Sequence, residues 1–116
     1  MSDSPTIFGK ILRGEIPATR LWDDEHCIAI RDISPVAPHH LLILPKRFIA
    51  TLEEVEATDA PLLGHMVFVA TRLAKELGFA ESGYRLVMNC GSHGGQSVFH
   101  IHLRLVGGRS LQWPPG

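Results

Sequence analysis

The sequence contains little cysteine, few aromatic residues and no excess of charge. Its two cysteines, Cys27 and Cys90, lie far apart and form no C-x-x-C pair. This is typical of a reducing compartment, where both behave as small hydrophobes; a structural disulfide between them is the second interpretation. The formal net charge is -1 and 7% of the residues are aromatic. A general nucleic-acid or membrane-surface protein is therefore disfavoured, and any anionic ligand requires a local site.

Long apolar runs and targeting signals are also missing. No run approaches the roughly 18 apolar residues of a membrane helix. Residues 1–5 lack the basic and apolar regions of a signal peptide. We expect a cytoplasmic protein in which residues 1–5 form a flexible N-terminus.

The remaining sequence predicts one α+β domain over residues 1–116. A chain of 116 residues that is 45% apolar can bury a core without disulfides. Apolar periodicity and the positions of glycine and proline predict a short helix, three strands, a long helix and two strands in a largely antiparallel sheet. The expected helices are 7–14 and 61–77, with a short helical segment at 52–55; the expected strands are 20–23, 27–32, 40–44, 84–89 and 98–106.

The most informative pattern is the alternation over residues 98–106. As a strand, this segment places His100, His102 and Arg104 on one face. The other face then carries the apolar side chains Phe99, Ile101, Leu103 and Leu105. Imidazole, with an ordinary pKa of roughly 6.5, serves as nucleophile, proton carrier or metal ligand, and a guanidinium adds fixed positive charge. The pattern therefore favours a face that binds phosphate.

Two further features lie near this face. The sequence Gly94-Gly95-Gln96-Ser97 immediately precedes it and offers backbone N–H groups and a hydroxyl. Such a loop can form a phosphate cradle, although an ordinary hairpin turn is the alternative interpretation. A second histidine pair, His39-His40, begins the strand expected at 40–44. If that strand neighbours the last one, His40 can reach the same face.

Together these motifs resemble the histidine triad (HIT) superfamily, and in particular its Hint branch of purine nucleoside phosphoramidate hydrolases. The resemblance extends over almost the whole chain, through residues 6–11, 32–40, 94–103 and 105–116. It implies a HIT-like fold with one long and one short helix, and a homodimer whose two five-stranded sheets join, with the tail 107–116 at the interface. It also implies a purine nucleotide site on each protomer and no cofactor.

The resemblance implies roles for individual residues. His102 matches the nucleophile that forms a transient nucleotidyl-histidine, and His100 and His40 match residues that orient it. Phosphate contacts are implied at Asn89, Gly95, Gln96, Ser97, His100 and His102, and Asp32 matches the residue that binds the ribose hydroxyls. The apolar slot for the base is implied at Ile7, Phe8, Ile11, Ile30 and Ile33, where ordinary core packing is the alternative. Trp113 matches a residue that reaches the partner's site and shapes leaving-group preference.

Arg104 departs from the family pattern, which has a third histidine at this position. Arginine does not act as a general acid at neutral pH, but it can hydrogen-bond a phosphate oxygen. We predict retained nucleotide binding, with catalysis altered in rate or leaving-group range, on substrates such as AMP-amine, AMP-lysine or acyl-adenylate conjugates. The main alternative is a non-catalytic nucleotide-binding or scaffold protein.

A zinc-binding protein is a further alternative. His40, His100 and His102 offer the three nitrogens that zinc sites use. Zinc-binding members of the superfamily take two cysteines from an N-terminal C-x-x-C, however, and residues 6–9 contain none. We therefore expect no metal.

Overall fold

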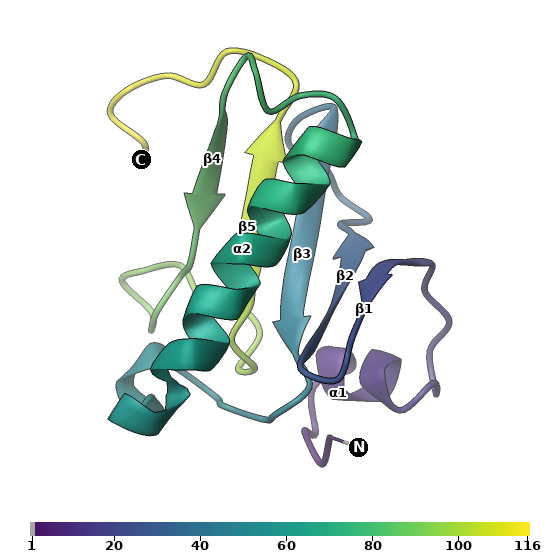
Figure 1. Cartoon of the computed structure of the whole chain (residues 1–116). Helices are drawn as coiled ribbons and strands as arrows, with labels where there is room; N and C mark the ends of the chain where they lie inside the picture. The colour runs from purple at the N-terminus through teal and green to yellow at the C-terminus, as the bar shows by residue number, and fades with distance from the viewer. Residues whose placement is uncertain (1) are drawn as a thin grey trace.

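The computed structural model describes residues 2–116, and its elements form one α+β unit (Figure 1). The sheet has five strands in the order β1-β2-β3-β5-β4, and every neighbouring pair is antiparallel. The elements are α1 (Ile7–Leu12), β1 (Arg20–Asp23), β2 (Cys27–Arg31), β3 (His39–Pro45), α2 (Ala60–Glu76), β4 (Tyr84–Val87) and β5 (Leu103–Gly107), with two 3-10 turns at Leu52–Glu54 and Ala57–Asp59. The predicted fold class and element order are confirmed.

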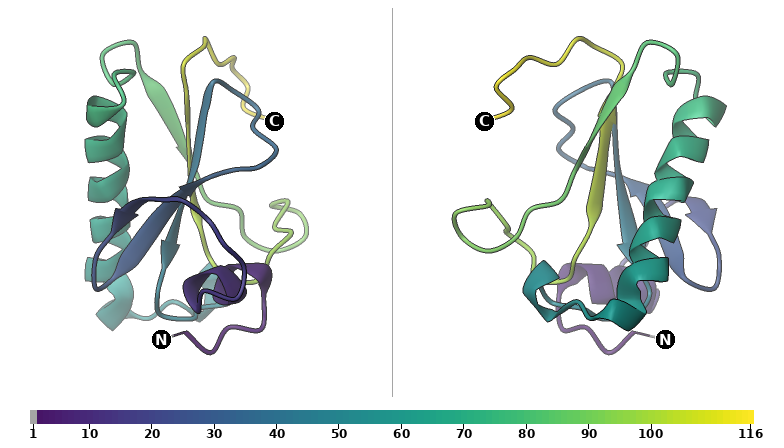
Figure 2. Two further views of the ribbon diagram at one scale, coloured as in Figure 1. Left: turned by 90° about the vertical axis from the view of Figure 1, so that its right-hand side faces the viewer. Right: turned by 60° about the vertical axis from the view of Figure 1, so that its left-hand side comes forward.

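The two helices lie on opposite faces of the sheet (Figure 2). Residues of β2 and β3 alternate between them, as the two-residue period of a strand requires. One set, Cys27, Ala29, Leu41 and Ile43, packs with α2. The other, Ile28, Ile30, Leu42 and Leu44, packs with Phe8 and Ile11 of α1. Both faces are therefore covered over β2 and β3, but by helices of very different length.

The central pairing of β3 with β5 brings the two histidine-containing segments together. In this register His40 lies opposite Val106, and Leu42 lies opposite Arg104. The expectation that the strand beginning at His39-His40 neighbours the last strand is thereby confirmed. Segments separated by some sixty positions in the sequence therefore lie side by side, on the face of the sheet that α1 partly covers.

The last strand is shorter than predicted and begins at Leu103 rather than Val98. The preceding residues leave the strand ladder because they bond to the chain that follows β3. Ile101 N–H donates to the Ile49 carbonyl at 2.8 Å, and the His100 ring bonds the Pro45 carbonyl. Phe99, expected on the apolar face, is 47% exposed. Alternation therefore predicts the positions of Leu103 and Leu105 correctly, but not that of Phe99.

The N-terminal segment before α1 packs against the rest of the domain. Ser2 and Ser4 are buried, and the Arg13 guanidinium donates to both of their carbonyls. Gly9 permits this contact, since a Cβ there would lie 2.1 Å from the Ser4 carbonyl oxygen. These contacts attach Ser2 and Ser4 to α1 and the residue that follows it, whereas the flexibility expected over residues 1–5 stays a prediction; Met1 lies outside the described residues.

Two further expectations can be compared with the structure. Both cysteines are free, with Cys27 buried and Cys90 half-buried, so the disulfide interpretation is wrong. Among residues 2–116, no helix has the length and apolar character needed to cross a membrane.

Candidate functional site

His102 lies directly before β5, buried under α1. Its Nδ1 lies 2.9 Å from the His100 carbonyl oxygen. A carbonyl only accepts, so Nδ1 carries the proton and Nε2 keeps its lone pair. Phe8 of α1 packs against the ring in an edge-on geometry, with centroids 4.9 Å apart. Burial lowers the pKa of His102; the Arg104 charge lowers it further, and the bond to the His100 carbonyl opposes both. The ring is therefore neutral at neutral pH, with its nucleophilic nitrogen fixed.

His100 is fully buried and serves to place the backbone that holds His102. Its Nε2 lies 2.9 Å from the Pro45 carbonyl oxygen, which ties the segment before β5 to the end of β3. Burial lowers the pKa of His100, so this ring too is neutral. Its Nδ1 is buried without a partner among the described residues. The geometry supports His100 as a positioning residue, acting through its own carbonyl.

His40 faces a carboxylate from the start of β3. Its Nδ1 accepts a hydrogen bond from Val36 N–H, which leaves the proton on Nε2. That nitrogen lies 3.5 Å from Asp32 Oδ2. Burial lowers the pKa of His40, Asp32 raises it, and Arg104 lowers it. His40 Nε2 therefore lies beside Asp32 without a hydrogen bond to a described residue, while the contact to Val36 fixes the ring.

Arg104 connects Asp32 with Asn89. Its Nε donates to Asn89 Oδ1 at 3.0 Å, and its Nη1 lies 3.5 Å from Asp32 Oδ2. The Asn89 amide nitrogen in turn donates to the Gly94 carbonyl at 2.7 Å. Arg104 thus joins the expected ribose carboxylate to the expected phosphate-binding amide, which in turn bonds the glycine-rich loop. Sequence alone predicts a cation here, but not these partners.

The glycine-rich loop over residues 91–97 is a compact turn, and hydrogen bonds of the Gln96 side chain hold it in place. Gly91 N–H donates to the Gln96 side-chain oxygen, and the Gln96 amide donates to the Ala50 and Val98 carbonyls. Gln96 is buried and these bonds occupy its side-chain amide, so the side chain holds the loop; its expected contact with phosphate stays a prediction. Gly95 has a φ of 77°, which favours glycine, and its N–H donates to the Ser92 carbonyl within the turn. Ser97 is exposed.

An apolar cavity of about 510 Å³ lies between α1, β2 and the segment that joins α1 to β1. Four of the five residues expected around the base line it: Ile7, Ile11, Ile30 and Ile33. The fifth, Phe8, does not; it is buried beneath the two histidines. This position agrees with the core-packing alternative for Phe8, and its contact with the base stays a prediction. Ile33, by contrast, is 96% exposed and forms a rim of the cavity.

A second cavity of about 420 Å³ is lined by polar groups from the expected phosphate region. Its walls include His40, Asn89, Gly95 and Arg104, together with residues of the C-terminal tail. Asp32 follows β2, whose Ile30 lines the apolar cavity, and it contacts the His40 and Arg104 of this second cavity. The chain thus offers an apolar compartment and a cationic one with a carboxylate between them.

The C-terminal tail is attached to the domain at points that sequence analysis does not predict. The Arg109 guanidinium donates to the Val36 carbonyl, and Arg85 donates to the Gln112 carbonyl. Because Val36 N–H also bonds His40, the tail supports the ring of a site histidine through one backbone residue. No sequence signal identifies such backbone contacts. Trp113 is 83% exposed on this chain.

The three histidines do not form a metal-ligand set. Within residues 2–116, the only group of three ligand types that approach one another closely is Asp24, Cys27 and His65, at the other end of β2. His100 and His102 each direct a ring nitrogen at a backbone carbonyl instead. The interpretation of His40, His100 and His102 as a zinc site is therefore not supported by the geometry.

Comparisons with known proteins agree with this architecture. The HIT domain model matches residues 13–111. The chain is similar to the 14 kDa zinc-binding protein of Zea mays, with 48% identity over 100% of this chain and 91% of the relative. Its structure is similar to that of a HIT family hydrolase from Legionella pneumophila, with a TM-score of 0.92, 53% identity, and coverage of 95% of this chain and 98% of the other. It is also similar to a histidine triad nucleotide-binding protein from Candida albicans, with a TM-score of 0.79, 30% identity, and coverage of 94% and 82%. The chain therefore belongs to the HIT family.

Proposed function

We propose that this protein is a hydrolase of purine nucleoside 5′-phosphoramidates, of the Hint branch of the HIT family, acting through a nucleotidyl intermediate on His102. One observation carries the proposal: the bond from His102 Nδ1 to the His100 carbonyl leaves Nε2 as a neutral nucleophile. The names of two similar structures, a HIT family hydrolase and a histidine triad nucleotide-binding protein, support hydrolysis and a nucleotide substrate.

The reaction proceeds in two displacements at the α-phosphorus. The lone pair of His102 Nε2 forms a bond to phosphorus while the bond from phosphorus to the substrate amine breaks; the amine leaves with a proton taken from solvent. Water then attacks the same phosphorus, the P–Nε2 bond breaks, and the nucleoside monophosphate is released as His102 regains its lone pair. Covalent catalysis thereby divides one difficult step into two easier ones. Arg104 does not supply the proton, because a guanidinium does not act as a general acid at neutral pH.

The two cavities divide the substrate between them. The purine occupies the apolar cavity beside Ile7, Ile11 and Ile30, whose burial of apolar area favours a flat ring. Asp32 accepts hydrogen bonds from the ribose hydroxyls at the junction of the cavities. The phosphate lies beside His102. Its donors are the Ser97 hydroxyl, the Asn89 amide hydrogen that is not bonded to the Gly94 carbonyl, and the Gly95 N–H, which exchanges its bond to the Ser92 carbonyl for one to the phosphate. Fixed donors of this kind stabilise the charge that develops on the phosphoryl oxygens.

Arg104 acts in this proposal mainly through Asn89. Its Nε occupies the amide oxygen, so the NH₂ group of Asn89 is the part that can face a phosphate. Its positive charge also lowers the pKa of His102, as described above. The first effect leaves an N–H donor for the phosphate, and the second keeps His102 neutral. We therefore expect turnover with a rate and leaving-group range that differ from those of a protein with histidine at this position.

We further propose that the active form is a homodimer in which residues 1–116 form one HIT domain per protomer. Trp113 is the supporting observation, because a tryptophan that is 83% exposed has a large apolar surface to cover. In the dimer, the tail 107–116 lies at the interface and Trp113 reaches the partner's leaving-group region.

The direct test is the release of AMP from adenosine 5′-phosphoramidate by the purified protein, with the His102→Ala variant beside it. The proposal predicts turnover that this variant abolishes. His93→Gln is the matched control, because His93 is exposed on the glycine-rich loop and makes none of the contacts described above. Tight AMP binding without turnover would contradict the proposal and favour the scaffold alternative.

A further inference from the structure

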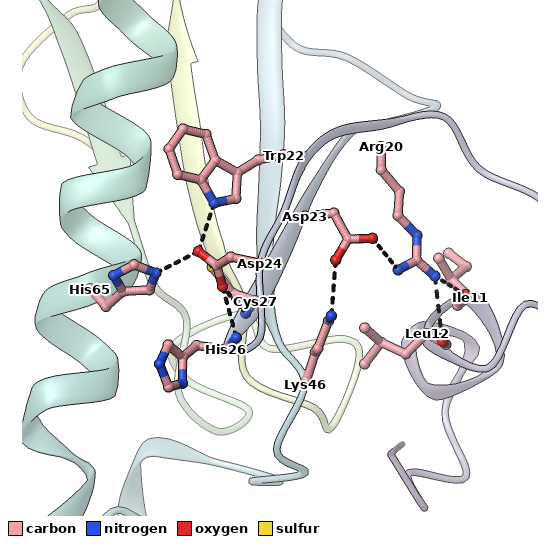
Figure 3. Close-up of polar contacts among 10 residues, drawn as sticks. All are labelled: Ile11, Leu12, Arg20, Trp22, Asp23, Asp24, His26, Cys27, Lys46 and His65. Atoms are coloured by element: carbon pink, nitrogen blue, oxygen red, sulfur yellow. Dashed lines mark hydrogen bonds and ion pairs between the residues drawn. The ribbon is translucent and has the colours of Figure 1, made fainter.

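A second cluster of reactive side chains lies where the β1–β2 turn meets α2 (Figure 3). Asp24 Oδ2 lies 2.6 Å from His65 Nε2 and 3.9 Å from Cys27 Sγ. The three candidate ligand atoms all lie within 4.8 Å of one another. Two of these residues come from the hairpin and the third comes from α2, forty-one positions further along the chain. The fold therefore assembles a thiol, an imidazole and a carboxylate at one point.

The carboxylate is oriented in advance by the protein around it. Asp24 Oδ1 accepts hydrogen bonds from the backbone N–H groups of His26 and Cys27, at 2.7 and 2.9 Å. Its other oxygen accepts from the Trp22 indole N–H at 2.7 Å, which Figure 3 shows together with the contact to His65. A metal-binding carboxylate is held by donors of this kind in its second shell. Oδ2 is the oxygen that faces the thiol and the imidazole.

A cavity reaches the His65 side of the cluster, although Asp24 and Cys27 do not line it. It measures about 520 Å³ and is lined by His65 and His26 along with Glu25, Lys46 and Asp59. None of the residues proposed for the nucleotide site lines it. Cys27 itself is fully buried, whereas the His65 side chain is 30% exposed. An ion entering through this cavity would meet His65 first and the sulfur last.

From this geometry we propose that Asp24, Cys27 and His65 form a binding site for a thiolate-accepting divalent cation, of which Zn²⁺ fits the donor set best. Sulfur, nitrogen and carboxylate oxygen are the three ligand types that Zn²⁺ takes in proteins, and a tetrahedral site would take water as its fourth ligand. On binding, the Cys27 thiol loses its proton to solvent and the sulfur lone pair forms the metal bond. Without metal, His65 Nε2 carries the proton that it donates to Asp24 Oδ2. On binding, Nε2 gives up this proton to solvent and binds the metal through its lone pair, Nδ1 takes up a proton from solvent, and Asp24 binds through Oδ2.

The competing interpretation is that Asp24 only joins the hairpin to α2 by hydrogen bonds. That interpretation explains the contacts to Trp22 and His65, and in it the Cys27 thiol donates a long hydrogen bond of 3.9 Å to Asp24 Oδ2. The two interpretations therefore differ in whether a metal ion can replace the thiol proton. Burial, together with the charge of Asp24, raises the pKa of the Cys27 thiol to about 12. Because the metal must replace this proton, the affinity of the site should increase with pH.

Titration of the metal-free, full-length protein with Co²⁺, followed by absorption spectroscopy, tests the proposal. We expect one equivalent to produce the near-ultraviolet charge-transfer band of a cobalt–thiolate bond, and Zn²⁺ to displace it. Cys27→Ser should remove this band. His65→Gln should weaken binding by at least about tenfold. Trp22→Phe removes the indole N–H that orients Asp24 and should weaken binding by about 10–100-fold. His93→Gln, another exposed histidine, should leave the titration unchanged.

Two results would overturn the proposal. One is the absence of a thiolate band in the folded wild-type protein, which would leave the hydrogen-bonded hairpin as the function of the cluster. The other is a band that survives in His65→Gln, a variant of a half-exposed residue whose folding circular dichroism can verify. The same titration of His102→Ala separates this site from the nucleotide site, because the band must persist there. The outcome is independent of phosphoramidate hydrolysis.

Discussion

The two faces of the sheet carry different side chains, although both are formed by the same alternating strands. Leu41 and Leu105 point to α2 and belong to a wholly apolar cluster. Their neighbours His40 and Arg104 point to the other face, where polar side chains are buried or half-buried beside α1 and the C-terminal tail. Because β3 and β5 contribute to both faces, adjacent residues should have separable effects: one set on the free energy of unfolding, the other on catalysis and binding.

The largest effect is expected on the catalytic face. His102→Ala removes the proposed nucleophile, and kcat/KM for adenosine 5′-phosphoramidate should fall by about 10⁴-fold or more. The cost in stability should be the smaller effect, because the residue lies outside the α2 core. Steady-state kinetics and thermal unfolding of the same preparation measure both. A variant that retains a tenth of the wild-type rate would contradict the assignment of His102.

The opposite result is expected from Leu105→Ala on the α2 face. Leu105 is fully buried, and truncation there leaves a cavity that costs about 2–5 kcal/mol of unfolding free energy. Chemical denaturation measures this loss. At low temperature, where the variant remains folded, kcat should stay close to the wild-type value. A large fall in kcat with unchanged stability would show that the two faces are not separable.

A smaller effect is expected from Arg104, which lies next to Leu105 but faces the site. Arg104→Ala removes the bond to Asn89, so AMP binding should weaken by about tenfold, as expected for the loss of one charged hydrogen bond. Isothermal titration calorimetry measures it. Arg104→His should bind AMP less tightly as well but should retain turnover. If Asn89→Ala weakens binding while Arg104→Ala does not, Arg104 has no positioning role.

The smallest effect is a shift in pH dependence. Because burial and Arg104 lower the pKa of His102, the nucleophile remains unprotonated below the ordinary imidazole range, and kcat/KM should fall only in more acidic solution. Removing the positive charge in Arg104→Gln raises that pKa, so the acidic limb should move to higher pH. A pH–rate profile for each protein gives the comparison. An acidic limb that stays in place in the variant would exclude an electrostatic effect of Arg104 on His102.

The sequence predicted regular elements better than it predicted contacts. Periodicity and the glycine and proline positions located both helices and the five strands, because local preferences and burial agree there. It placed the last strand too early, because long-range bonds from His100 to Pro45 and from Ile101 to Ile49 remove this segment from the ladder. No local pattern encodes such partners.

For the candidate site, too, the sequence predicted residues better than it predicted their contacts. Residue types and spacing singled out His102 and Arg104, and the family resemblance added Asp32. Arg104 and Asp32 lie next to each other, and the charges of both act on His102. Residue types and spacing did not distinguish Gln96, which holds the loop, from the phosphate contacts proposed around it. They also missed the Asp24 cluster, since its third member lies on a distant helix. Contacts between elements require the tertiary structure.

The most direct test of the central claim is to trap the covalent intermediate. Wild-type protein mixed with adenosine 5′-phosphoramidate is quenched within a single turnover, digested under conditions that preserve the P–N bond, and examined by tandem mass spectrometry. We predict a mass increase of one adenylyl group on the peptide containing His102, localised to that residue and absent from His102→Ala. An adenylyl group on another residue, or AMP release in a single turnover without any adduct, would contradict the account.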